Sequence, residues 1–209
     1  MANPLHPLLV SGIEQLGVDV SQFQLQQLTD YILLVQRWNK AFNLTAVRDL
    51  DGMVVKHLLD SLAVSNYVQS RRLIDVGTGA GFPGIPLAIA QPECDVTLLD
   101  SNGKKTRFLF QVKTGLKLNN VSIVESRVEA HHPTTLYDAV ISRAFASLPR
   151  MVDSCRHLLE PDGTLYAMKA AAVTEEINQL DHRGEVLRCQ QLSVPYLNES
   201  RSLVALKLS

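Results

Sequence analysis

Apolar residues recur at helical spacing through the first 70 residues of the chain. Ser21 suits a helix N-cap, and the apolar positions after it follow one another at steps of three and four residues: Leu25, Leu28, Ile32 and Val35. This spacing predicts an amphipathic helix of about five turns. A shorter helix is expected around residues 5–16, and another over residues 50–67. The N-terminal third is therefore predicted to be helical.

From Arg72 onward the pattern changes to short runs rich in Val, Ile and Leu, separated by segments of helical length. The runs are "RLIDVG", "DVTLLDS", "VSIVES", "YDAVISRA" and "GTLYAMK". This alternation is typical of a doubly wound parallel sheet. The last two runs, "VLRCQQLSVPYL" and "SLVALKL", are joined only by residues 198–201, which leaves no room for a crossover helix.

These patterns predict an α/β fold of the Rossmann-like kind. We expect a mostly parallel seven-stranded sheet with an antiparallel last strand, preceded by N-terminal helices. No repeat or linker divides the chain, so residues 1–209 are expected to form one domain. Within it, residues 1–70 would be a helical extension and residues 71–209 the doubly wound core.

The segment after the first predicted strand, "DVGTGAGFPGIP", carries three glycines at alternate positions. Gly77, Gly79 and Gly81 let the backbone pass close to a ligand. A dinucleotide fingerprint, GxGxxG, requires a small residue at position 82, where this chain has Phe82. The prolines at positions 83 and 86 also remove two backbone N–H groups that a pyrophosphate needs.

Asp100 stands at the end of the second predicted strand, where an acid can bind both hydroxyls of a ribose. NAD and S-adenosylmethionine both contain such a ribose, but only NAD has phosphates. An acid such as Asp75 also favours the sulfonium and amino groups of S-adenosylmethionine. The combination favours a methyltransferase over a nicotinamide-dependent oxidoreductase. A protein that binds S-adenosylmethionine without chemistry is a third hypothesis.

Composition and charge narrow the class of partner. The net charge is −1, but Lys104, Lys105 and Arg107 follow Asp100 with no acid among them. Two interpretations of this basic face stay open: a binding surface for a polyanion, or a solvated helix face. The three cysteines lack metal-binding spacing, so no metal is expected, and we interpret them as buried apolar residues. No segment has the length and apolarity of a membrane span, and no secretory leader is recognisable, so we expect a cytoplasmic protein.

The segment after the fourth strand, "ISRAFASLP", bears on the methylated atom. It has no Asn/Asp-Pro-Pro-aromatic motif for an exocyclic amine, and it has no cysteine nucleophile for a pyrimidine carbon. Guanine N7 already has an in-plane lone pair, so an enzyme can methylate it by alignment and desolvation. We therefore assign no general base.

Several stretches together resemble the RsmG (GidB) family of bacterial 16S ribosomal RNA methyltransferases. They are "WNKAFNLTAVRD", "HLLDSLAV", "DVGTGAGFPGIPLAIA", "LLDSNGKKTRFL" and "SRAFASL". The resemblance implies methylation of guanine N7 in 16S ribosomal RNA near the decoding region. It implies S-adenosylmethionine as donor, and free 16S ribosomal RNA or the small ribosomal subunit as partner. We expect the protein to be a monomer.

The resemblance also implies cofactor contacts at particular residues: Gly77, Phe82, Val128, Glu129 and Arg143. Our own interpretation adds Gly79, Gly81 and Asp100 to the cofactor site, and it expects Arg143 to shape the catalytic pocket. RNA phosphates are expected at Lys104, Lys105, Arg107 and Lys169. The chain departs from the family at Ala170, where a glycine usually follows the lysine.

His57, Asp60 and Ser61 share one face of a predicted helix. The resemblance suggests a functional role for them. A hydrogen-bonded network that secures the helical extension is the alternative, and the sequence leaves both open.

Overall fold

The computed structural model describes residues 3–143, 146–170 and 173–208. A seven-stranded sheet lies at its centre. The strands are β1 (Arg72–Val76), β2 (Asp95–Asp100), β3 (Val121–Glu125), β4 (Tyr137–Arg143), β5 (Leu159–Lys169), β6 (Gly184–Leu192) and β7 (Arg201–Leu208). Their order is β3-β2-β1-β4-β5-β7-β6. Neighbouring strands from β3 to β5 are parallel, whereas β7 runs antiparallel to both β5 and β6. The fold prediction is confirmed.

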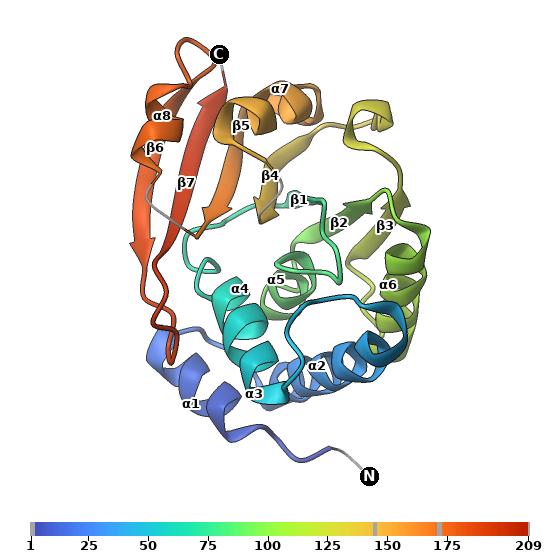
Figure 1. Ribbon diagram of the computed structural model, residues 1–209. Helices are drawn as coiled ribbons and strands as arrows, with labels where there is room; N and C mark the ends of the chain where they lie inside the picture. Colours follow the sequence, from blue (N-terminus) through green and yellow to red (C-terminus); the bar gives the residue numbers. More distant parts are fainter. Residues whose placement is uncertain (1–2, 144–145, 171–172, 209) are drawn as a thin grey trace.

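Helices cover both faces of the sheet (Figure 1). One side carries α1 (Pro7–Leu16), α2 (Gln22–Phe42), α3 (Leu50–Met53), α4 (Asp60–Leu62), α5 (Gly84–Ala90) and α6 (Gly103–Leu116). The other side carries α7 (Leu148–Cys155) and α8 (Thr174–Asn178). A π-helical segment, η1 (Val54–Leu59), joins α3 to α4, and two 3-10 turns, η2 (Val128–Ala130) and η3 (Arg156–Leu158), flank β4 and β5.

Two apolar clusters hold these layers together. Leu73 belongs to the cluster under α1 to α6, and its neighbour Ile74 belongs to the cluster under α7. Successive residues of a strand point to opposite faces, so β1 joins both clusters. Both of these side chains are fully buried. The continuous apolar character of the strand follows from burial on both faces.

The helical N-terminal region agrees with the sequence prediction in most details. Ser21 caps α2 by a reciprocal capping box with Gln24. The predicted helix over residues 50–67 instead ends at Leu62, because the backbone N–H and the hydroxyl of Ser65 both bind the Leu62 carbonyl and turn the chain. The π-helical turns within it were not expected, since the same apolar residues suit an α-helix.

Two further predictions were wrong. The strand expected to run to Leu197 ends at Leu192, and Pro195, which cannot donate to a ladder, lies in the segment beyond. Cys189 is exposed on β6, although Cys94 and Cys155 are buried as expected.

No described helix is long and apolar enough to cross a membrane.

Candidate cofactor and substrate site

The glycine loop after β1 is tied to the end of β2. The backbone N–H groups of Gly77 and Thr78 both donate to the carbonyl oxygen of Leu99, at 2.8 and 3.1 Å. Gly77, Gly79 and Gly81 have φ values of 70°, 63° and 105°, a region that favours glycine. The loop therefore crosses the carboxyl edge of the sheet, where ligands of such folds bind.

The start of α5 differs from a phosphate-binding helix start. The Gly84 N–H donates to Asp75 Oδ2, and the N–H groups of Ile85 and Leu87 donate to the carbonyls of Gly81 and Pro83. Pro86 has no N–H. No donor of this first turn is left for a pyrophosphate, which supports the sequence argument against a dinucleotide.

Asp75 lies beneath the loop rather than at its surface. The carboxylate is 1% exposed, and its Oδ2 accepts from the Thr78 hydroxyl at 2.6 Å and from the Gly84 N–H at 2.8 Å. Burial raises the pKa of Asp75 to about 6, although these two hydrogen bonds act in the opposite direction. Its Oδ1 is buried with no hydrogen-bond partner. Asp75 thus holds the loop in shape and leaves one acceptor unused.

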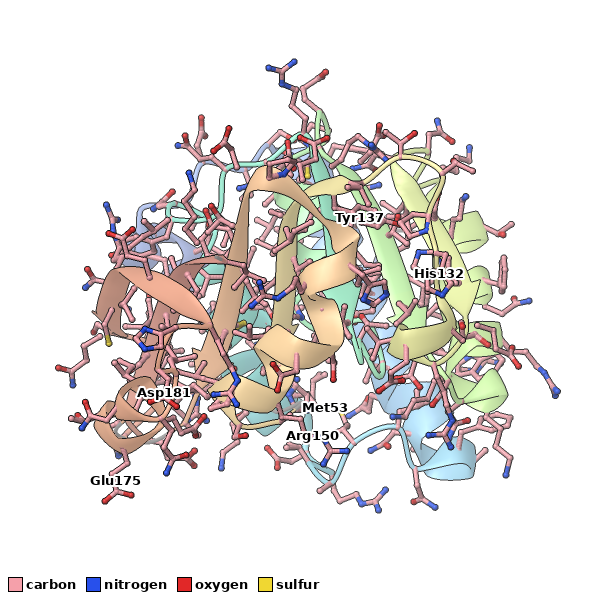
Figure 2. All side chains as sticks on the ribbon, turned by 90° about the horizontal axis from the view of Figure 1, so that it is seen from above. Met53, His132, Tyr137, Arg150, Glu175 and Asp181 are labelled. Atoms are coloured by element: carbon pink, nitrogen blue, oxygen red, sulfur yellow. The ribbon has the colours of Figure 1, made fainter. Side chains whose placement is uncertain are left out.

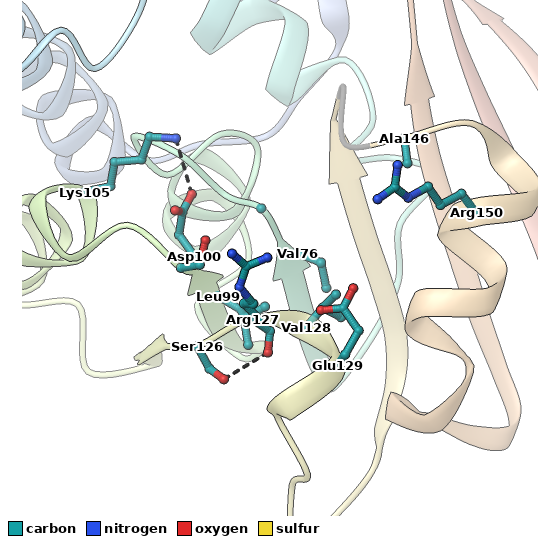
Figure 3. A pocket seen from close by; sticks show the side chains of 12 residues that line it. Val76, Leu99, Asp100, Lys105, Ser126, Arg127, Val128, Glu129, Ala146 and Arg150 are labelled. Atoms are coloured by element: carbon teal, nitrogen blue, oxygen red, sulfur yellow. Dashed lines mark hydrogen bonds and ion pairs between the residues drawn. The ribbon is translucent and has the colours of Figure 1, made fainter.

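A cavity of about 390 Å³ lies between the glycine loop and the ends of β2 and β3 (Figure 3). Asp100 lines it with a carboxylate that accepts from the N–H groups of Gly79 and Asn102, both at 2.9 Å. Lys105 Nζ lies 3.5 Å from Asp100 Oδ2 and also lines the cavity. We name this space the cofactor pocket. Its acid is fixed in place before any ligand binds.

The cofactor pocket brings together five residues that the sequence singled out. They are Gly77, Asp100, Lys105, Val128 and Glu129. Arg127 follows the third strand, at the edge where the sequence predicts a ligand site, but it had no assigned role. The other lining residues were not predicted: Val76, Leu99, Ser101, Ser126, Ala146 and Arg150. Arg127 and Arg150 lie on opposite sides of the pocket (Figure 3), and their positions on a loop and on α7 gave no recognisable motif.

The other predicted cofactor residues lie outside this lining. Gly81 packs against the core, where an added Cβ would lie 2.6 Å from Ile85 Cγ1 and 2.9 Å from Tyr31 Oη. Gly79 is near the pocket, with its Cβ position 3.9 Å from Lys105 Nζ. Phe82 is 4% exposed and turns toward the helical region, with its ring 5.3 Å from Tyr31 and 4.7 Å from His57.

Arg143 lies at the end of β4 among groups from the helical region. Its guanidinium donates to Asp60 Oδ2 and to the Lys56 carbonyl, both at 3.1 Å, and lies 5.2 Å from the Phe82 ring centre. Asp60, 2% exposed, also accepts from Arg201 Nε at 3.1 Å through Oδ1. One buried carboxylate therefore connects the strand ends of β4 and β7 to the helical region.

His57 is held as a neutral ring beside Arg143. Its Nδ1 lies 3.0 Å from the Lys56 carbonyl oxygen, and its Nε2 lies 2.7 Å from the Thr45 hydroxyl. A neutral ring with its proton on Nδ1 makes both hydrogen bonds, because Nδ1 then donates to the carbonyl and Nε2 accepts from the hydroxyl. Burial and then the Arg143 charge lower the pKa of His57 to about 4. The alternative of a hydrogen-bonded network describes His57 and Asp60 in this structure, whereas the buried Ser61 hydroxyl has no partner.

The predicted RNA-binding residues occupy two different settings. Lys104 and Arg107 are exposed on the first turns of α6, next to the cofactor pocket. Lys169 is half-buried: its Nζ donates to the Ala146 carbonyl at 2.5 Å and pairs with Glu176 at 2.8 Å. Two acids of the segment that follows β5, Glu175 and Asp181, lie on the opposite side of the view from the green helix α6 (Figure 2). They are therefore remote from the basic residues of α6. Phe145 lies outside the described residues.

The cofactor pocket has the chemistry that S-adenosylmethionine requires. Asp100 presents a carboxylate to a ribose, Val76, Leu99 and Val128 present apolar surface to a purine, and Glu129 presents a second acid to cationic groups. Within the described part of the chain, no group of three or more His, Cys, Asp or Glu side chains is placed to hold a metal.

Comparison with known proteins decides the family. The family described as GidB, rRNA small subunit methyltransferase G, matches residues 24–204. Two relatives carry the name ribosomal RNA small subunit methyltransferase G. The one from Hydrogenovibrio crunogenus is 51% identical over 199 residues, or 95% of this chain and 92% of the relative. The one from Enterobacter sp. (strain 638) is 48% identical over 207 residues, or 99% and 98%.

This chain belongs to the rRNA small subunit methyltransferase G family. The predicted resemblance, and with it the expectation of a methyltransferase that uses S-adenosylmethionine, is confirmed at the level of the family.

Solved structures show the same fold. A magnesium protoporphyrin IX methyltransferase from Synechocystis PCC 6803 has a TM-score of 0.61 at 18% identity, covering 85% of this chain and 97% of that one. A predicted O-methyltransferase from Agrobacterium tumefaciens has a TM-score of 0.59 at 18% identity, covering 72% and 80%. This chain therefore shares its architecture with methyltransferases of other substrates, and its substrate must be argued from its own site.

Proposed function

We propose that this protein transfers a methyl group from S-adenosylmethionine to N7 of a guanine in 16S ribosomal RNA. The observation that carries the proposal is the cofactor pocket at the carboxyl edge of the sheet, with Asp100 and Gly77 in its lining, in a chain of the rRNA small subunit methyltransferase G family. The proposal includes action on free 16S ribosomal RNA or on the small subunit, in the cytoplasm, as a one-domain monomer without a metal.

The residues of the pocket have separable tasks in this proposal. Among the lining residues, Asp100 would accept hydrogen bonds from the ribose hydroxyls, Val128 and Leu99 would contact the adenine, and Glu129 would face the positive end of the ligand. Bound S-adenosylmethionine supplies an electrophilic methyl group on its sulfonium. Holding that group in line with the attacking nitrogen and excluding water is the contribution of the protein.

The nucleophile is expected to come from the substrate. No cysteine is among the described residues that line the cofactor pocket, and burial raises the pKa of the Cys155 thiol on α7 to about 12. A thiolate that could attack a pyrimidine carbon is therefore absent from the pocket. Guanine N7 needs neither a covalent intermediate nor loss of a proton, which fits a pocket without an assigned general base.

The test is methyl incorporation from a donor that is isotopically labelled in its methyl group. The wild-type protein is incubated separately with 16S ribosomal RNA, with intact small subunits and, as a control, with 23S ribosomal RNA. We expect label in the 16S strand of at least one small-subunit form and none in 23S ribosomal RNA. Binding of the donor without incorporation into either 16S form would contradict the proposal and favour a non-catalytic binding protein.

A further inference from the structure

A second cavity, of about 380 Å³, is lined by Arg143 and by residues outside the lining of the cofactor pocket. It is enclosed by the loop before α3, by η1 and α4, and by the ends of β4, β5, β6 and β7. Among the described residues, 3–143, 146–170 and 173–208, the two cavities share no lining residue. We name the second one the Arg143 pocket. Arg143, expected to shape a catalytic pocket, and Lys169, expected to bind RNA phosphates, both line it.

The walls of the Arg143 pocket are largely apolar. Val47, Met168 and Leu192 line it from three separate segments, and Met168 and Leu192 are 3% and 8% exposed. Apolar walls with a few polar groups are typical of sites for small organic ligands. A flat purine or pyrimidine fits such walls by contact with its faces.

Cations outnumber acids around this apolar space, because its four cationic side chains pair with three acids: Asp60, Glu176 and Glu199. Four cationic side chains line the pocket: Lys56, Arg143, Lys169 and Arg201. Asp60 is the one acid among the lining residues, and both of its oxygens are already bound by arginines. Lys56 stays 46% exposed at the side chain, paired with the half-exposed Glu199. An occupant with an apolar ring and an anionic group matches this combination, and a nucleotide has both.

Lys169 connects the two cavities physically. Its Nζ donates to the carbonyl oxygen of Ala146, which lines the cofactor pocket, while Lys169 itself lines the Arg143 pocket. Arg143 and Lys169 also end the neighbouring parallel strands β4 and β5. A ligand in the Arg143 pocket would therefore sit at the same sheet edge as the methyl donor.

We infer that the Arg143 pocket receives the target nucleotide, a purine turned out of the RNA strand. This inference rests on the proposed function, because it assigns the acceptor of that reaction to a second cavity. Enzymes that act on a base place it in a closed pocket, and the cost of unstacking is lowest in a loop. Cations at the pocket hold the flanking phosphates, and the apolar walls hold the base.

Two substitutions that fill the Arg143 pocket test the inference by kinetics. Ala170→Trp adds an indole from an exposed position after β5, and Ser202→Phe adds a ring from β7. We expect each to lower kcat/KM for 16S ribosomal RNA at least about tenfold, with the Kd for S-adenosylmethionine within about twofold of wild type. The matched control is Ala41→Trp, at an exposed position on α2 outside this lining, for which both constants should remain at the wild-type values. Wild-type kcat/KM in both filled variants would overturn the inference.

A second measurement locates the nucleotide without any need for methyl transfer. Guanosine monophosphate is titrated into the full-length wild-type protein saturated with S-adenosylhomocysteine, and the methyl signals of Met168 and Leu192 are followed by NMR. We expect saturable shifts at both methyl groups, lost in Ala170→Trp. Shifts confined to other residues, or no shift, overturn the inference. If wild type methylates no RNA but shows these shifts, the proposed function fails and the nucleotide pocket stands.

Discussion

Gly77, Gly79 and Gly81 share a positive φ, but their surroundings differ. Gly77 lines the cofactor pocket, whereas Gly81 is enclosed by Ile85, Tyr31 and Leu109. Glycine at position 77 therefore lets a ligand approach the backbone, whereas glycine at position 81 lets the loop pack closely on the helical region. The spacing of the three residues in the sequence is equal and carries no sign of this difference.

Gly81→Ala is expected to lower the free energy of unfolding by about 2–4 kcal/mol, for two reasons. The new methyl group clashes with the core, and alanine is strained at this positive φ. Gly79→Ala meets only ordinary contacts, with Lys105 Nζ at 3.9 Å and the Gly77 carbonyl oxygen at 4.0 Å, and should cost about 1–2 kcal/mol for its positive φ. Urea unfolding at equilibrium measures both. Gly115→Ala, on α6 with nothing within 4 Å, provides a control that should not destabilise. Equal losses at positions 79 and 81 would contradict this account of the loop.

Asp100→Ala is expected to raise the Kd for S-adenosylmethionine by about 10- to 100-fold, since it removes hydrogen bonds from a charged acceptor. Asp95→Ala is the matched control, because Asp95 is exposed at the opposite end of the same strand. Isothermal titration calorimetry compares the two variants with wild type. An unchanged Kd for Asp100→Ala would remove the assignment of the ribose contact.

The elements of the fold were largely predictable, but the directions of loop side chains were not. Alternating strand and helix patterns predicted the sheet, and Ser21 predicted the start of α2. The sequence did not predict that Phe82 turns away from the cofactor pocket. That direction depends on Tyr31 and His57, which reach the loop only through tertiary packing. Arg150 on α7 was missed for the same reason.

The packing of η1 against the loop predicts a pH-dependent stability. The pKa of His57 is about 4 in the folded protein and about 6.5 in the unfolded chain, so the unfolded state binds the proton first as the pH falls. The contribution of His57 is fully present above pH 6.5 and is lost between pH 6.5 and 4. The loss amounts to about 3 kcal/mol.

His57→Gln isolates this contribution. Asp75, whose folded pKa is about 6 against an unfolded value near 3.8, stabilises the fold as the pH falls over part of the same range, so the wild-type profile alone is not diagnostic. The difference in unfolding free energy between wild type and His57→Gln should shrink by about 3 kcal/mol from pH 7 to pH 4. Urea unfolding at several pH values measures it, with His182→Gln at an exposed position as control. A difference that stays constant with pH would rule out a buried neutral His57.

At the scale of the whole molecule, charge is segregated although the net charge is only −1. The basic start of α6 lies beside the cofactor pocket, and the acidic segment with Glu175 and Asp181 lies away from it (Figure 2). The sequence predicted this basic segment from its charges alone. The Arg143 pocket could not be predicted, because its cations come from η1, β4, β5 and β7 and meet only in the fold.

Lys104→Ala is expected to weaken binding of 16S ribosomal RNA and to lower the slope of log Kd against log salt concentration by about 0.7–0.9, the value for one lost phosphate contact. Lys117→Ala removes the same charge from the far end of α6 and should leave the slope unchanged. Filter binding at several salt concentrations compares the two. Equal slopes for wild type and Lys104→Ala would place the RNA elsewhere on the surface.

The identity of the methylated atom tests the account as a whole. Small subunits and free 16S ribosomal RNA lacking the modification are incubated with the wild-type protein and labelled S-adenosylmethionine. The RNA is then fragmented, and the modified nucleotide is located and identified by mass spectrometry. We predict a single labelled N7-methylguanine in 16S ribosomal RNA. Label on another atom, on another base or at many scattered guanines would contradict the proposed reaction.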